Sequence, residues 1–308
     1  MPITSGNFPD LLEPGLKAIF DTAVSRPRPM VEELFGMEAS TKRQEHYLGM
    51  GATGLVPVFD GTVNYEDFDS YYKTSIMNYE LAQGMVVERA LVDDEMYGEI
   101  NRRAVRLGGS FDRTIESDAA DVFINAFTDG GTNRLGASTN GADGVALLSA
   151  AHPYSPAQSG TTQSNEGTLT LNVANVDTTR QNMLNFTDDK GELLGVEADT
   201  ILVPTELERT ARQIFGRGAI WEPGSAQFDR NMFEGAMRIV VWNRLTDANA
   251  WFLIDSMLMK QHLHWQWRIR PEFAQADDFD GIKAKYRGYM RYGIGWDYWA
   301  FIFGQNPS

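Results

Sequence analysis

The sequence predicts an α+β protein with four parts: an extended arm, a projecting hairpin, one long isolated helix and a mixed remainder. Three observations carry this expectation. An apolar stripe at helical spacing continues from 94 to 127. The segment before it is rich in aromatic and β-branched residues but has few aliphatic ones, as expected of a hairpin that leaves the body. After 258, apolar and polar side chains alternate, which is typical of strands.

The N-terminal part predicts an arm followed by a hairpin. Residues 1–45 are punctuated by prolines, so we expect one short helix within 11–24 and otherwise an extended arm held by other parts. Residues 46–92 read as strands and turns, with a turn signal at Asp60-Gly61. One section of this hairpin is acidic, at Glu66, Asp67 and Asp69.

The long helix is the strongest secondary-structure prediction. The acidic residues at its start, Asp93 to Glu95, would stabilise the positive N-terminal end of the helix dipole, and Gly130-Gly131 follows its end. At 1.5 Å per residue it would extend about 50 Å. Gly108-Gly109 lies in its middle, where we expect a bend. The apolar stripe consists of Met96, Ile100, Ala104, Leu107, Phe111, Ile115, Ala119, Val122 and Ala126.

The remainder predicts alternating helices and strands. We expect a helix over 176–188 opened by Asp177, and a buried strand, a Pro-Thr turn and a helix over 198–216. Two more strands are expected within 236–257, and residues 282–303 are strand-like throughout. The stretch HLHWQWRIR predicts a strand with two faces. Leu263, Trp265, Trp267 and Ile269 form its apolar face, and His262, His264, Gln266, Arg268 and Arg270 form a face expected to meet solvent or a partner.

Composition excludes several functions. The formal net charge of −15 argues against nonspecific DNA binding by the whole surface, although it leaves room for a local basic patch. The absence of cysteine excludes disulfides, thiolate metal sites and thiol nucleophiles. No apolar run approaches the ~18 residues of a membrane span, and the start of the sequence does not resemble a secretory signal.

The stretch GMGATG, residues 49–54, matches the glycine spacing of a dinucleotide-binding loop. That loop must lead from a strand into a helix, whose N-terminus binds the pyrophosphate. Here Pro57 and the Asp60-Gly61 turn follow, which leaves no room for a helix. We therefore interpret GMGATG as a flexible glycine turn in a hairpin.

No catalytic, metal or cofactor site is predicted. Arg268 and Arg270 would repel a cation from His262 and His264, and His152 has no carboxylate next to it in the sequence. The acidic stretch 277–281 lacks the alternating ligands of a calcium loop and is expected to be a solvated turn. A pair of carboxylates in a cleft stays open, and with it a soluble hydrolase.

The order of these parts resembles the major capsid protein of tailed bacteriophages, the Hong Kong 97 fold, and most closely its Mu-like head-protein branch. Three stretches carry the resemblance: 143–171 with its D-G, its H-P and a later Asn, the strand-to-helix turn at 198–215, and the aromatic tail with its D-F-D-G entry. The order covers nearly the whole chain. The resemblance implies an N-arm over 1–45, an E-loop over 46–84, a peripheral domain over 85–160 and 255–308 with the spine helix, and an axial domain over 161–254.

The resemblance also implies partners. Such subunits form pentamers and hexamers that close into an icosahedral shell around double-stranded DNA in a virion assembled in the host cytoplasm, without sequence-specific DNA binding. We expect a separate scaffolding protein, a portal and possible decoration proteins, and no membrane. Members that crosslink use an E-loop lysine. Lys73 is the only lysine between 43 and 92, but its partner is not evident, so we predict no crosslink.

The residues suggest how neighbouring subunits would touch. The acidic hairpin section would lie on a basic face of a neighbour's spine helix, and hairpin aromatics would supply apolar anchors. The acids are Glu66, Asp67 and Asp69, the bases Arg102, Arg103 and Arg106, and the aromatics Phe59, Tyr65, Phe68, Tyr71 and Tyr72. An encapsulin-like nanocompartment, which shares the fold but holds cargo enzymes, is the alternative.

Overall fold

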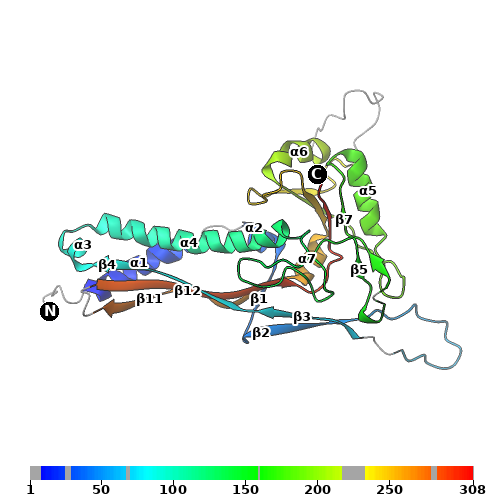
Figure 1. Cartoon of the computed structure of the whole chain (residues 1–308), viewed down its shortest axis with the longest axis horizontal. Helices are drawn as coiled ribbons and strands as arrows, with labels where there is room; N and C mark the ends of the chain where they lie inside the picture. Colours follow the sequence, from blue (N-terminus) through cyan, green and yellow to red (C-terminus); the bar gives the residue numbers. More distant parts are fainter. Residues whose placement is uncertain are drawn as a thin grey trace.

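The computed structural model describes residues 8–24, 29–66, 70–158, 160–216, 233–278 and 283–307. The chain has an elongated part and an upright part, with a hairpin that projects beyond both (Figure 1). In the elongated part, helices lie against a long four-stranded sheet. The upright part is built around a five-stranded sheet. The α+β expectation is confirmed.

The long helix α4 forms the spine of the elongated part. Its buried residues follow the predicted stripe, and they include Ile100, Leu107, Phe111 and Ile115. The helix is shorter than expected, because the chain turns at Glu95 between α3 and α4. Glu95 has a φ of 53°, and backbone bonds from its N–H and that of the next residue close the end of α3. The helices here are α1 (Phe8–Val24), α2 (Pro29–Leu34), α3 (Arg89–Asp93) and α4 (Tyr97–Ile124).

Gly108 and Gly109 do not interrupt α4, and Gly108 has a packing role. A Cβ on Gly108 would lie 2.6 Å from Cβ of Ala23 and 2.9 Å from the carbonyl oxygen of Phe20. Gly108 therefore lets α1 cross α4 at close range. Gly109 faces away from α1, and its nearest neighbour would be the end of the flexible Arg113 side chain, at 3.5 Å.

The four-stranded sheet has the order β1-β11-β12-β4. Its central pair, β11 and β12, is antiparallel, and β4 is the antiparallel edge strand. One face carries α1 and α4, since a Cβ on Gly288 of β12 would meet the rings of Phe111 and Phe20. The strands are β1 (Gly36–Ala39), β4 (Tyr79–Glu88), β11 (Leu263–Asp278) and β12 (Lys283–Trp296).

The projecting hairpin is a separate two-stranded sheet of β2 (Gln44–Met50) and β3 (Ser70–Met77). Its inner end is fixed to the body by Ile76, which is buried against Gly293 and Gly295 of β12. Beyond Met50 the chain continues without helix or strand through residue 66. The hairpin predicted from composition is thus present, and the strand that follows it, β4, lies in the four-stranded sheet.

The upright part contains the five-stranded sheet, in the order β7-β13-β10-β8-β9. The strand-turn-helix expected over 198–216 is confirmed. The expected continuous strand over 282–303 is wrong, because a turn after Trp296 places its last residues in this second sheet. The elements are β5 (His152–Pro153), β6 (Thr162–Gln163), β7 (Glu166–Gly167), α5 (Val173–Leu184), β8 (Thr200–Val203), α6 (Glu208–Phe215), β9 (Arg238–Val241), β10 (Trp251–Ile254), α7 (Ser256–His262) and β13 (Ile302–Gln305), with short 3-10 turns at Pro156–Gln158 and Thr205–Leu207.

Helix α5 begins earlier than expected. Asn172 is its N-cap and accepts a hydrogen bond from the backbone N–H of Asn175 at 2.9 Å. Asp177, expected to open this helix, lies inside it and accepts a bond from the Gln181 side chain instead. Both residue types cap helices well, so tertiary packing decided which one was used.

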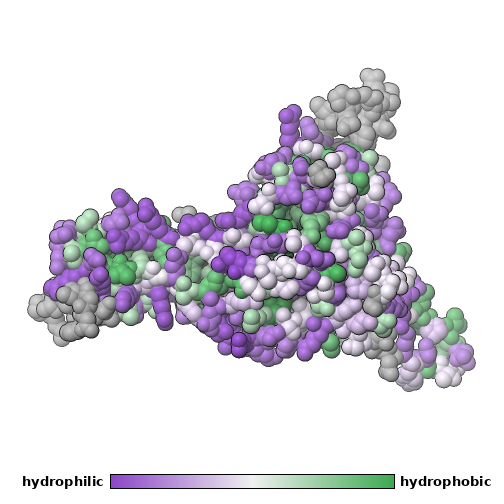
Figure 2. All heavy atoms as spheres, in the orientation of Figure 1, coloured by the Kyte–Doolittle hydropathy of each residue, from purple (hydrophilic) through white to green (hydrophobic). Residues whose placement is uncertain are grey.

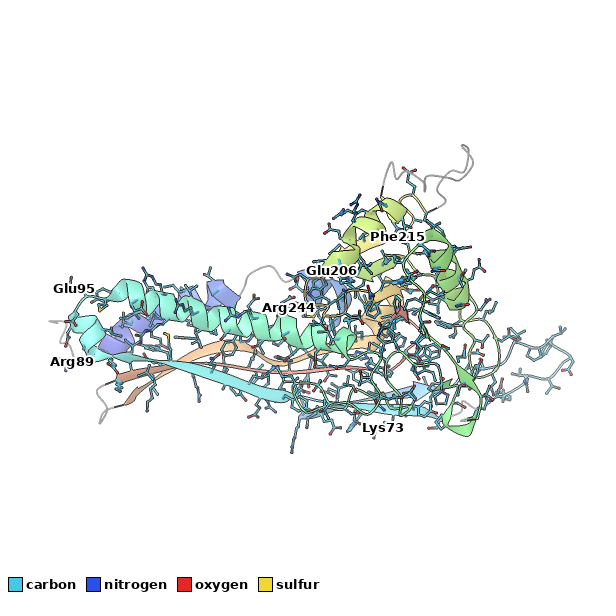
Figure 3. All side chains as sticks on the ribbon, turned by 45° about the horizontal axis from the view of Figure 1, so that its top comes forward. Lys73, Arg89, Glu95, Glu206, Phe215 and Arg244 are labelled. Atoms are coloured by element: carbon cyan, nitrogen blue, oxygen red, sulfur yellow. The ribbon has the colours of Figure 1, made fainter. Side chains whose placement is uncertain are left out.

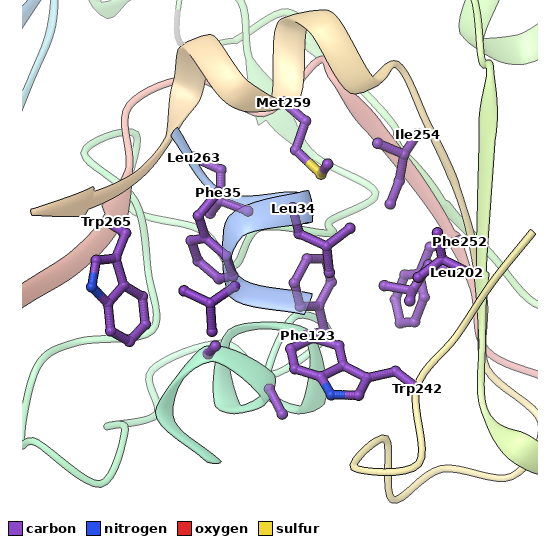
Figure 4. Close-up of a cluster of buried hydrophobic side chains, with 14 of the residues drawn as sticks. Leu34, Phe35, Phe123, Leu202, Trp242, Phe252, Ile254, Met259, Leu263 and Trp265 are labelled. Carbon is purple, nitrogen blue, oxygen red and sulfur yellow. The ribbon is translucent and has the colours of Figure 1, made fainter. Parts of the chain in front are cut away.

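One apolar core joins the elongated and upright parts. Figure 4 shows its centre, where Leu34 at the end of α2 and the following Phe35 meet Phe123 of α4, and the upright part supplies Trp242 and Phe252. All five side chains are almost fully buried. Burying a large apolar side chain contributes about 1.5–3 kcal/mol, so this junction fixes the two parts relative to each other. In the part of the chain described, no helix is long and apolar enough to span a membrane.

Candidate assembly surfaces

The outer segment of the hairpin is an exposed apolar surface. Val56 and Val58 are 94% and 95% exposed, and both predicted anchors in this segment, Phe59 and Tyr65, are also exposed. Figure 2 shows apolar residues at this tip, at the lower right of the view. A contiguous exposed apolar patch on a folded subunit marks an interaction site. We call it the tip patch: Leu55, Val56, Val58, Phe59, Val63 and Tyr65.

A second exposed apolar surface lies at the opposite end of the long axis, around the α3–α4 corner (Figures 1 and 2). Figure 3 labels Arg89 and Glu95 at this corner. The half-buried Leu91 and Val92 of α3 pack beneath it against the core. We call it the corner patch: Val86, Met96, Tyr97 and Val105, each at least two-fifths exposed.

The predicted basic face of the spine helix borders the corner patch. Arg103 lies 3.4 Å from Glu99 Oε1, and its guanidinium also donates to the carbonyl of Val86 at 3.2 Å. Arg102 lies 3.9 Å from the same Glu99 carboxylate and is mostly exposed, and Arg106 is exposed. Arg103 thus ties α4 to β4 in its own chain, which leaves Arg102 and Arg106 as the outward-facing cations of the three.

Of the predicted acidic section, only Glu66 lies in the described residues; Asp67, Phe68 and Asp69 lie outside them. Glu66 is used within its own chain. Its carboxylate accepts from the Gly54 N–H at 3.1 Å and lies 3.6 Å from Lys190 Nζ. The neighbouring Asp189 accepts from the Ala52 N–H at 2.9 Å. The turn at 188–191 therefore holds the root of the outer segment.

Tyr71 and Tyr72, predicted as anchors for a neighbour, are half-buried in their own subunit. The Tyr71 hydroxyl donates to the carbonyl of Tyr154, and its ring packs edge-on against Tyr72 and Tyr298. Burial raises the pKa of both Tyr71 and Tyr72. These contacts stabilise the hairpin on the body. Of the predicted aromatics within the described residues, Phe59 and Tyr65 face outward.

The base of the hairpin covers a buried polar cluster that the sequence did not predict. His264 and Gln266 were expected on a solvated or partner-facing side of their strand, yet they are 3% and 0% exposed. Tyr47 of β2 covers them. Its ring stacks on His264 at 4.0 Å between centroids, and its hydroxyl donates to Glu38 at 2.5 Å.

Asp297 completes this cluster. Its Oδ1 lies 3.0 Å from Nδ1 of His262 and 3.2 Å from Nε2 of His264. Burial by itself raises the pKa of Asp297, but the two histidine hydrogen bonds outweigh it and bring that pKa down to about 2. Asp297 follows His264 by 33 residues, so only strand pairing brings them together. Among the described residues, no group of three or more His, Asp or Glu side chains could hold a metal ion.

His152 does have a carboxylate partner. Asp143 lies 2.7 Å from its Nδ1, and the imidazole stacks on Trp299 at 4.4 Å. Both polar side chains are buried. This pair fastens the loop after the spine helix beneath the upright part, which gives the D-G and H-P motifs a structural role.

Lys73 is exposed on β3, at the rim of a cavity of about 530 Å³ between the hairpin, the end of α4 and the 133–142 loop. Asn125, Asn133 and Asn140 also line this cavity. The glycine stretch 49–54 ends β2 and is followed by irregular chain, not by a helix. The geometry of a dinucleotide-binding loop is therefore not formed there.

Comparison with known proteins supports a shell-forming chain. A family model described as phage capsid protein matches residues 82–303, from the edge strand through the spine helix and both sheets. The chain belongs to the phage capsid protein family. No curated protein matches this capsid protein.

Solved capsids share the fold. The procapsid protein of bacteriophage JBD30 superposes with a TM-score of 0.53 at 12% identity, over 99% of the capsid protein and 77% of that chain. The mature capsid of bacteriophage PhiM1 gives a TM-score of 0.55 at 13% identity, over 89% of this chain and 86% of that one. A virus-like particle from Pyrococcus furiosus gives a TM-score of 0.52 at 10% identity, over 95% of this chain and 98% of that one. The Hong Kong 97-type fold is thus confirmed, and the protein is a structural capsid protein that self-associates into the virion shell.

Proposed function

We propose that this capsid protein forms pentamers and hexamers that close into the icosahedral head of a tailed phage, enclosing double-stranded DNA. The carrying observation is the pair of exposed apolar patches at opposite ends of one elongated subunit. A contact between two different surfaces is head-to-tail, and such contacts generate closed rings when the rotation between subunits closes. The role is structural rather than catalytic.

The four-part division supports this proposal. We propose an N-arm over 1–45, an E-loop beginning at 46, a peripheral domain with the spine helix, and an axial domain over 161–254. The separate two-stranded sheet suggests an E-loop that ends near Met77, before β4 joins the four-stranded sheet. The glycines of 49–54 would let its outer segment adjust. Kinship with the Mu-like branch, and scaffolding, portal and decoration partners, belong to the same proposal.

The tip patch of one subunit would dock on the corner patch of a neighbour. Both are apolar and unpartnered in the single chain, and burying such surface contributes about 25 cal/mol per Å². Arg102 and Arg106 beside the corner patch would pair with hairpin carboxylates and set the register. Exposed pairs of this kind contribute under about 1 kcal/mol each, so the apolar contact would carry most of the affinity.

The test replaces two valines of the tip patch by charged aspartates. Val56→Asp with Val58→Asp should abolish shells and rings, seen by negative-stain electron microscopy and size-exclusion chromatography, while circular dichroism stays that of the wild type. Met257→Asp changes another exposed apolar residue, on α7 and outside both patches, and should still assemble. Arg102→Glu with Arg106→Glu should weaken assembly less. Normal shells from the double valine variant would refute tip-to-corner docking.

An encapsulin-like nanocompartment is the alternative function, favoured by the likeness to the Pyrococcus furiosus virus-like particle. The two functions differ in content. Nuclease-protected double-stranded DNA in native particles would select the phage head, whereas packaged cargo protein without DNA would select the compartment.

A further inference from the structure

We infer that His264 acts as a pH-responsive latch that holds the base of the β2–β3 hairpin against the body of its own subunit. The inference concerns one chain and does not depend on how copies associate. It arises from the polar cluster beneath Tyr47, which the shell-forming role does not require.

Both ring nitrogens of His264 face carboxylates. Nδ1 lies 3.0 Å from Oε1 of Glu38, and Nε2 lies 3.2 Å from Oδ1 of Asp297. A neutral imidazole carries one N–H, whereas an ionised carboxylate only accepts. The two hydrogen bonds can therefore form together only when His264 is the doubly protonated cation.

The hairpin rests on this cation through Tyr47. The phenol ring stacks on the imidazolium at 4.0 Å with an interplanar angle of 20°, an arrangement that favours a positive charge over the ring face. The Tyr47 hydroxyl donates to Oε2 of Glu38, the same carboxylate that His264 engages. Gln266 in turn donates to that hydroxyl. Losing the proton on His264 would thus weaken the stack and leave one of the two carboxylates, Glu38 or Asp297, short of one donor.

The surrounding charges favour the protonated form. The ionisable groups facing the latch are Glu38 of β1, Tyr47 of β2, Asp297 after β12 and His262 of α7, with Glu45 acting on Tyr47 from the same strand. Burial lowers the pKa of His264, but the Asp297 and Glu38 carboxylates outweigh it and raise that pKa overall.

The sign of the pH dependence follows. Because the pKa of His264 is raised on folding, its contribution is fully present below the unfolded value of about 6.5 and is lost as pH rises through the folded value. Because the pKa of Asp297 is lowered to about 2, its contribution is present above about pH 4 and is lost as pH falls through that folded value. The latch is strongest between about pH 4 and about pH 6.5 and opens on the alkaline side.

The test is hydrogen exchange with mass spectrometry on the unassembled, full-length subunit, corrected for the intrinsic pH dependence of exchange. Protection of the β2 and β3 amides should fall between about pH 6 and about pH 8.5, because protonated His264 favours the closed hairpin by a factor of ten for each unit by which folding raises its pKa, and that factor is lost as pH rises through the folded value. Protection of α4 should stay constant. His264→Gln should remove the pH dependence at the hairpin, and His46→Gln, which changes an exposed histidine of β2 itself, should keep it.

Constant hairpin protection in the wild type would overturn the inference, as would an unchanged pH dependence in His264→Gln. A parallel loss in α4 would also overturn it, because that result reports global unfolding. If His264→Gln does not fold, Glu38→Gln replaces it. Removing one of the two carboxylates should move the midpoint of the fall to lower pH, and an unmoved midpoint would count against the latch.

Discussion

Replacing Gly108 by alanine tests the close crossing of α1 and α4. The new Cβ would lie 2.6 Å from Cβ of Ala23 and 2.9 Å from the Phe20 carbonyl oxygen, whereas carbon atoms in contact are normally about 3.5–4.0 Å apart. Helix α1 would have to move outward by roughly 1 Å, and overpacking of this kind costs about 1–3 kcal/mol. Because alanine has a higher helix propensity than glycine, the substitution also stabilises the helix by about 0.5–1 kcal/mol. We expect a net loss of about 1 kcal/mol.

Gly109→Ala is the matched control, because the same substitution one residue later meets only the end of the Arg113 side chain. It should stabilise the subunit by about 0.5–1 kcal/mol. Thermal unfolding of the unassembled subunit, followed by circular dichroism, measures both. The Gly108 variant should melt about 2–4 °C below the wild type and the Gly109 variant slightly above it. If both variants were stabilised alike, α1 would not cross α4 at Gly108.

Three further stability predictions follow from single contacts. Asp118→Ala removes a buried carboxylate that accepts from both Arg134 and the Tyr292 hydroxyl, each at 2.5 Å. It should lower the free energy of unfolding, measured in urea, by roughly 2–3 kcal/mol. The control Asp93→Ala removes an exposed ion pair with Arg89 and should lower it by under about 0.5 kcal/mol. Glu95→Gly relieves a φ of 53° and should stabilise the subunit by about 1 kcal/mol; a loss would mean that this turn is not left-handed. Asn172→Ala removes the cap of α5 and should cost about 1 kcal/mol, but Asp177→Ala should cost little, and the reverse order would restore Asp177 as the cap.

The sequence by itself determined the elements that local periodicity encodes. The apolar stripe through Ile100, Leu107 and Ile115 required a helix buried on one side, and the structure buries those residues. The alternation at Leu263, Trp265 and Trp267 required a strand with one buried face, and these three side chains are buried. The order of arm, hairpin, long helix and mixed remainder was likewise enough to indicate the family.

The tertiary structure decided how the other faces are used. Nothing near His264 in the sequence reveals that Tyr47, Glu38 and Asp297 surround it, because each comes from a different element. Gly108 and Gly109 are indistinguishable in the sequence, and only the position of α1 makes one a close contact and the other a surface residue. Periodicity depends only on residues close together in the sequence, so helices and strands can be predicted from local sequence. Burial of a polar face or a glycine depends on which distant segment packs against it, and that is settled only when the whole chain folds.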